Sequence, residues 1–183
     1  MAEGRNRRGG AYALTVFAPI LAGHEDAVQA VIETMPVGAD SPLARLDGLH
    51  FSRLQIFREL VHQGEKQRKR DRLRSSHLVF TSTIDGELDP YLDAICARLG
   101  AEADQWWQHC AGYPGTADPA AFKRYIREHQ ADTSLFASAH PNASVARVRE
   151  SVALRDRIVD FAAGAQVLDA AELQTRFRER FAR

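Results

Sequence analysis

Residues 77–95 read HLVFTSTIDGELDPYLDAI and join a strand-forming stretch to a helix-forming one. Residues 76–83 are rich in β-branched and aromatic side chains, which favour a β-strand. Asp85-Gly86 is typical of a tight turn. Asp89-Pro90 is a good helix opening, because proline lacks only a donor that the first turn does not use. The apolar residues that follow recur at helical spacing: Leu88, Tyr91, Leu92, Ile95 and Leu99.

The residues before this stretch predict two strands and a helix. Residues 11–18, AYALTVFA, favour a strand that stops at Pro19. Apolar residues between Ala27 and Met35 then recur at helical spacing, after Glu25 and Asp26, whose charges suit the first turn of a helix. A loop rich in proline and glycine precedes residues 49–57, LHFSRLQIF, which predict the second strand.

The residues after it predict a helix over 119–130, a fourth strand over 133–140 and two helices over 144–163 and 170–182. With the short helix over 119–130 set aside, the elements up to residue 140 run strand, helix, strand, strand, helix, strand, which is the order of a ferredoxin-like βαββαβ antiparallel sheet. We expect an α+β fold with additional C-terminal helices. It would comprise a flexible tail over 1–10, one domain over 11–163 and a helical extension over 164–183.

The composition excludes several classes of protein. The 24 basic and 24 acidic residues cancel, so net charge gives no reason to expect a nucleic-acid partner. The basic run over 66–74 is interrupted by Asp71 and is better explained as a solvated hairpin tip than as a phosphate-binding patch. No apolar run reaches the length of about 20 residues that crosses a bilayer, and the first residues do not resemble a signal peptide. We expect a cytoplasmic protein that does not enter the membrane.

Alternation along the predicted strands divides their side chains between two faces. One face would be aliphatic: Leu14, Val16, Leu54, Ile56, Val79, Leu135 and Ala137. The other would carry one phenylalanine from every strand among polar residues: Phe17, Phe51, Phe80 and Phe136, with Thr15, Arg53, Gln55, Ser82, Ser138 and His140. Helices would cover the aliphatic face. The aromatic face needs another cover, which could be the C-terminal helices, a second copy of the chain or a ligand.

Arg53 is the first candidate site residue, since a guanidinium among phenylalanines could clamp a carboxylate, a phosphate or a cofactor propionate. A strand-end ion pair is the alternative. His50 should lie on the opposite face by alternation, and should therefore not meet Arg53. Asp85 could act in catalysis or cap the backbone that follows it.

Residues 106–114, WWQHCAGYP, hold both tryptophans and could line a ligand pocket through Tyr113. His109 beside Cys110 suggests a nucleophile and its base, although adjacent residues at a helix end diverge. Packing of the rings over the sheet edge is the alternative. The seven histidines show no metal-ligand spacing, and His77 and His140 could become ligands only through folding.

Four segments taken in order resemble a little-characterised ferredoxin-like family associated with haem peroxidase and catalase-like proteins: LDGLHFSRLQIF, HLVFTSTIDGELDPYLDAI, WWQHCAGYPG and FKRYIREHQADTSLFASAHP. The residues that match its motif positions are His50, Arg53, Asp85, His109, Gly112, Tyr113 and Pro114. Residues 81–84 read TSTI, where that family more often has an asparagine and an aromatic residue. More loosely, the first strand and helix resemble the dimeric α+β barrel superfamily, which implies sheet-to-sheet dimers or pseudo-dimers.

These observations lead us to expect an oxidative enzyme, or an accessory protein that binds haem or another aromatic ligand on the aromatic face. The alternative is a non-catalytic dimerisation module. The expected catalytic residues are His109, Arg53 and Asp85, and the expected ligand-binding residues are Phe17, Phe51, Phe80, Phe136, His140 and Tyr113. A homodimer is the expected partner state.

Overall fold

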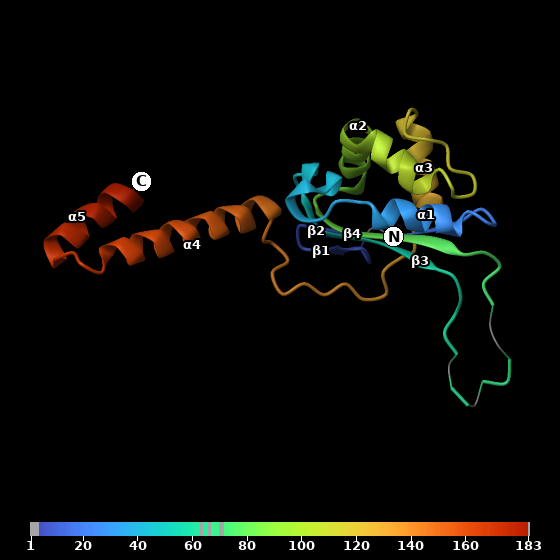
Figure 1. Ribbon diagram of the computed structural model, residues 1–183, viewed down its shortest axis with the longest axis horizontal. Helices are drawn as coiled ribbons and strands as arrows, with labels where there is room; N and C mark the ends of the chain where they lie inside the picture. The colour runs from blue at the N-terminus through green and yellow to red at the C-terminus, as the bar shows by residue number, and fades with distance from the viewer. Residues whose placement is uncertain (1–3, 63, 66, 70–71, 183) are drawn as a thin grey trace. The chain divides into compact units, whose positions relative to one another are not determined.

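A computed structural model describes residues 4–62, 64–65, 67–69 and 72–182 (Figure 1). The chain divides into two compact units, Met1–Val145 and Ala146–Arg183. None of the described helices is both long enough and apolar enough to cross a membrane. The hairpin tip predicted over 66–74 includes residues 66, 70 and 71, which lie outside the described part.

The first unit is an α+β unit with a four-stranded antiparallel sheet, in the order β1-β2-β4-β3. The strands are β1 (Arg7–Arg8), β2 (Ala11–Pro19), β3 (Leu49–Phe57) and β4 (His77–Asp85). The helices are α1 (Glu25–Glu33), α2 (Leu88–Trp107) and α3 (Pro119–Glu128), with short 3-10 turns η1 (Gly38–Asp40) and η2 (Pro42–Arg45). Figure 1 shows α1, α2 and α3 together on one side of the sheet.

The core lies between these helices and one face of the sheet. On β2 the side chains of Leu14, Val16 and Ala18 are buried, and they alternate with more exposed neighbours as a one-sided sheet requires. The helices contribute buried residues at helical spacing: Leu92, Ile95, Leu99, Ala103, Phe122 and Ile126. The predicted strands over 11–18, 49–57 and 76–83 are confirmed, as is the helix that begins beside Asp89-Pro90.

The predicted fourth strand over 133–140 is wrong. After α3 the chain makes only a brief contact with the free edge of β2, where the amide of Ala131 donates to the carbonyl of Thr15 at 2.9 Å. The amide of Thr133 then bonds the side chain of Asn6 at 2.7 Å, and residues 133–140 form no strand. Phe136 is half-buried in this irregular segment, and the expected ferredoxin-like strand order is not confirmed.

Residues before β2 occupy that edge instead. Arg7 and Arg8 pair with Tyr12 and Ala11, in a region for which we had expected a flexible tail. Asn6 is buried, and its carbonyl accepts a hydrogen bond from the amide of Ala13 at 2.8 Å. The N-terminal segment therefore pairs with residues 11–13 at one end of that edge, whereas His129 and Ala131 bond the backbone of Phe17 and Thr15 further along it.

The predicted faces hold for β2 and β3 but are inverted for β4. Register pairs Phe80 with Val16 and Leu54, so Phe80 lies on the helix-covered face and is fully buried. Its ring packs against Trp107 with centroids 5.2 Å apart. Ser82 also faces the helices, whereas Val79 lies on the opposite face, opposite Phe17. Alternation divides the side chains of one strand between two faces, but it does not show which of these faces matches a given face of the neighbouring strand. The prediction that Phe80 shares a face with Phe17 and Phe51 is therefore wrong.

The second unit is a helical hairpin of α4 (Val145–Ala165), which starts at the last residue of the first unit, and α5 (Ala170–Phe181). The Asp169 side chain caps α5 by accepting from the amides of Ala171 and Glu172, both at 2.9 Å. The ring of Phe161 contacts those of Phe177 and Phe181. No residue from 146 to 182 is buried, so the hairpin has only a small contact of its own.

Candidate functional site on the open sheet face

The sheet face opposite α1, α2 and α3 is here called the open face. It is formed by Thr15, Phe17, Phe51, Arg53, Gln55, Phe57, Val79, Thr81 and Thr83. The side chains of three phenylalanines on it reach solvent, with exposed fractions of 76% for Phe51, 42% for Phe57 and 40% for Phe17. Most of the residues between them are neutral and polar. This face therefore combines apolar area with little charge, which is uncommon for a surface in water.

The open face also carries Arg8 and Asp85, which both lie opposite Ala11 at one end of the sheet, and the charged side chain at its centre is Arg53. It lies opposite Thr81 of β4 and is exposed. It makes no hydrogen bond or ion pair with any residue that the structure describes, so the strand-end ion pair considered from the sequence is not found. A guanidinium without a carboxylate partner retains all its donors for an anion.

His50 meets Asp85 at one end of the sheet. The register of β3 against β4 shifts between Leu49 and Phe51, which makes His50 the extra residue of a β-bulge. Its Nε2 lies 2.8 Å from Oδ1 of Asp85. The other oxygen, Oδ2, accepts a hydrogen bond from the amide of Val145 at 2.8 Å. Asp85 thus caps a remote segment, not the backbone that follows it, and it orients an imidazole.

His109 lies far from this pair. Its carbonyl accepts from the amide of Leu21, just beyond the Pro19 end of β2, whereas Asp85 pairs with Ala11 at the other end. Eight residues of strand separate the two ends by about 26 Å. Arg53 lies midway along the sheet. The structure therefore does not bring the three expected catalytic residues together.

The expected nucleophile beside His109 is also unsuited to that role. Cys110 is buried, and burial raises the pKa of its thiol to about 12. The thiol therefore stays protonated at neutral pH, whereas the thiolate is the nucleophile. The ring of His109 turns to His24 instead, with the two Nδ1 atoms 2.9 Å apart.

Tyr113 belongs to an aromatic cluster between α2 and α3, not to an open pocket. Its ring contacts those of Trp107, Phe122 and Tyr125. Its hydroxyl donates to Oδ1 of Asp104 at 2.7 Å. Burial and the neighbouring carboxylate of Asp104 raise the pKa of Tyr113 above its usual range. Tyr113 therefore packs with other rings, which was the alternative to a ligand pocket in the sequence analysis.

His140 is exposed in the segment after α3, and His77 pairs with Phe57 at the far end of the sheet. These two histidines were the pair that folding could have joined as metal ligands. In the part of the chain that the structure describes, no three metal-ligating side chains gather at one point.

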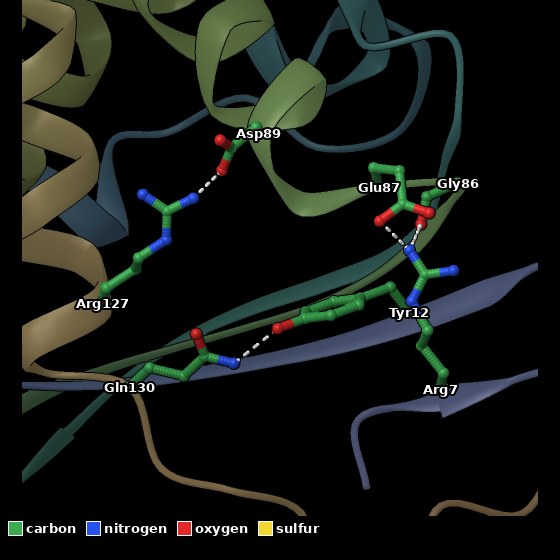
Figure 2. Close-up of polar contacts among 7 residues, drawn as sticks. All are labelled: Arg7, Tyr12, Gly86, Glu87, Asp89, Arg127 and Gln130. Atoms are coloured by element: carbon green, nitrogen blue, oxygen red, sulfur yellow. Dashed lines mark hydrogen bonds and ion pairs between the residues drawn. The ribbon is translucent and has the colours of Figure 1, made fainter. Parts of the chain in front are cut away.

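A groove of about 530 Å³ lies where β1, the start of α2 and the end of α3 converge (Figure 2). Arg7 pairs with Glu87, and Arg127 pairs with Asp89. Gln130 donates to the hydroxyl of Tyr12 at 2.7 Å. Both cations of the groove are already paired with the acids beside them. These ion pairs therefore connect β1 and α3 to the start of α2, and they leave neither arginine free for a charged ligand.

Three of these arrangements have no signal in the sequence. The sequence indicates the groove residues only as parts of strands and helices, because their partners lie up to 126 positions away in the chain. The contact of His24 with His109 joins residues 85 positions apart and has no local signal. The bulge at His50 has none either, since nothing in LHFSRLQIF distinguishes it from regular alternation.

Comparison with family models, with curated proteins and with solved structures gave no match to this chain.

Proposed function

We propose that this protein is an association module of ferredoxin-like type that dimerises with a second copy of itself through the open face. The observation that carries the proposal is the exposure of Phe17, Phe51 and Phe57 on one sheet face. Fully burying a phenylalanine is worth about 1.5–3 kcal/mol, so three of them on each subunit provide a substantial driving force.

A second copy suits this face better than an unrelated protein for two reasons. A two-fold contact joins the same patch of both subunits, so the patch must be complementary to itself. Phenylalanine, threonine and glutamine side chains can meet their own kind without the repulsion that like charges cause. Arg53, the cation at the centre of the face, avoids its copy if it lies off the two-fold axis.

The strand arrangement is compatible with the proposal that the sheet is of ferredoxin-like type. The neighbours β2-β4-β3 correspond to the first, third and second strands of a ferredoxin-like sheet, and a single bridge joins Val16 to Gln130 where the fourth would lie. The resemblance to the dimeric α+β barrel superfamily, in which sheets meet face to face, favours the same arrangement. Under this proposal, β1 replaces most of the fourth strand.

The test is the solution mass of the full chain and of Phe51→Glu by light scattering. We expect the wild type at twice 20.4 kDa and the variant at 20.4 kDa. Val37→Glu is the matched control, since Val37 is 85% exposed in a loop outside the sheet, and it should remain dimeric. Phe17→Thr, which adds no charge, should weaken the dimer if Phe51→Glu proves insoluble. A monomeric wild type, or a dimeric Phe51→Glu, would contradict the proposal.

A second candidate function is the binding of a flat aromatic anion, such as haem, between the two sheets, as an oxidative enzyme or its accessory. The observation in its favour is Arg53, exposed among phenylalanines and without a partner among the described residues. Titration with haemin should give a shifted Soret band, and Arg53→Gln should weaken binding at least tenfold. Equal haemin affinity of the wild type and of Arg53→Gln would contradict this second function, but it would not contradict the proposed dimer.

A further inference from the structure

His24 and His109 form a close pair of imidazoles on the helix-bearing side of the chain's first unit. Their Nδ1 atoms are 2.9 Å apart, and the ring centroids are 5.1 Å apart with the planes inclined by 49°. His24 is exposed and His109 is partly exposed, so an ion can reach the pair from solvent. Neither ring forms an ion pair with any described acidic residue.

The backbone holds both residues in place through Leu21. The amide of Leu21 donates to the carbonyl of His109 at 2.9 Å, and the carbonyl of Leu21 accepts from the amide of His24 at 3.0 Å. The residue that follows His109, Cys110, forms a β-bridge with Ile20. His24 is also the residue before α1, where its carbonyl accepts from the amide of Val28. The two rings are therefore presented to each other by a fixed framework.

Two Nδ1 atoms at this distance share one proton, because one nitrogen must donate and the other must accept. If the donor ring carries its proton on Nε2 instead, both imidazoles stay neutral and two Nδ1 lone pairs are directed toward the same small space. Zinc binds histidine nitrogen at about 2.0–2.1 Å, so two imidazoles in a tetrahedral site lie about 3.3 Å apart. The observed pair needs to open by only about 0.4 Å to accept such an ion in place of the proton.

We propose that His24 and His109 form a two-histidine site for a divalent transition-metal ion. Imidazole nitrogen suits Zn²⁺, Ni²⁺ and Cu²⁺, whereas Mg²⁺ and Ca²⁺ prefer oxygen ligands. No third side-chain ligand gathers with the pair within the described residues, so water completes the coordination. Of the three ions, Cu²⁺ binds most tightly, because affinity for a nitrogen site rises to copper along the series.

The tryptophans offer an internal reporter for this site. The chain contains two of them, Trp106 and Trp107, at the end of α2 just before His109. Cu²⁺ bound at the pair should therefore quench tryptophan fluorescence. Zn²⁺, which does not quench by electron transfer, should bind without that loss and can be followed by calorimetry.

The experiment titrates the full chain with Cu²⁺ by fluorescence and with Zn²⁺ by calorimetry. We expect one ion per chain at this site. His24→Gln and His109→Gln should each weaken both ions at least tenfold, since changes in outer-shell residues alone cost about 10–100-fold. His140→Gln is the matched control and should bind as the wild type does.

Circular dichroism of each variant separates loss of ligand from loss of fold. If either substitution unfolds the chain, His24→Asn and His109→Asn repeat the comparison with a smaller side chain. Unchanged affinity in folded variants of both histidines would overturn the proposal, as would an equal loss in His140→Gln. Binding of Mg²⁺ in preference to Zn²⁺ would also overturn it.

Discussion

The Nε2 atom of His50 lies 2.8 Å from Oδ1 of Asp85, although His50 should face away from the open side of the sheet if β3 alternated regularly. The bulge between Leu49 and Phe51 redirects its side chain. The second oxygen of Asp85 holds the amide of Val145, at the start of α4. One carboxylate therefore joins β3, β4 and the first residue of the following helix.

Replacing Asp85 should destabilise the first unit. Asp85→Ala leaves the amide of Val145 and the ring of His50 without their acceptor, and we expect a loss of about 1–3 kcal/mol in the free energy of unfolding. Urea denaturation measures this loss. Asp26→Ala is the control, since the exposed pair of Asp26 with Arg58 should contribute under about 1 kcal/mol. Equal losses in the two variants would mean that the hydrogen bonds of Asp85 stabilise the fold no more than an exposed ion pair does.

Two tyrosines in the aromatic cluster should respond differently to loss of the hydroxyl. Tyr113 donates to the carboxylate of Asp104, whereas the buried hydroxyl of Tyr125 has no hydrogen-bond partner among the described residues. Tyr113→Phe should cost about 1.5–3 kcal/mol, and Tyr125→Phe should change stability by less than about 0.5 kcal/mol. Thermal and urea unfolding of the pair test this contrast. A larger loss in Tyr125→Phe would show that its hydroxyl is in fact bonded.

Burial of Cys110 predicts a decline in stability at alkaline pH. The folded pKa is raised to about 12, whereas an unfolded thiol titrates near 8.5, so the unfolded chain releases its proton first. This contribution to stability is complete below pH 8.5 and declines as pH rises above it. Between pH 7 and 9.5 the wild type should lose about 1.4 kcal/mol more than Cys110→Ala. Parallel curves for the two proteins would show that Cys110 does not titrate this way.

Asn6 should matter more than its place near the end of the sequence suggests. Its side chain is 1% exposed, accepts from the amide of Thr133 and donates to Asp132. Asn6→Ala should lower the free energy of unfolding by about 1–3 kcal/mol and speed hydrogen exchange at the Thr133 amide. Arg8→Ala, on the exposed side of β1, should do neither. Slow exchange at Thr133 in the Asn6 variant would contradict this role.

The helices and strands that were predicted correctly are those whose own residues favour the observed structure. β2, β3 and β4 are rich in β-branched and aromatic residues, and α2 has a regular apolar stripe after Pro90. The fourth strand failed because two segments compete for one edge of β2. Residues 133–140 have the better strand composition, but Asn6, Arg7 and Arg8 pair with one end of that edge and residues 129–131 bond the rest. Local propensity cannot decide such a competition.

The candidate site was predictable only in part, for a related reason. Phe17, Phe51 and Arg53 share a face as alternation requires, but Phe80 does not, because its face depends on register with β2 and β3. Contacts across the chain, such as His24 with His109, follow from the completed fold. Sequence reasoning therefore located the open face and not the pairs around it.

The most direct test of the account uses the unmodified chain. Hydroxyl-radical footprinting, read by mass spectrometry, measures the solvent access of Phe51 and Phe57 at protein concentrations below and above dimer formation. We predict that labelling of both falls as the dimer forms, while labelling of Val37 stays constant. Equal labelling of Phe51 in monomer and dimer, or protection that persists in the monomer, would contradict the claim that a second copy covers the open face.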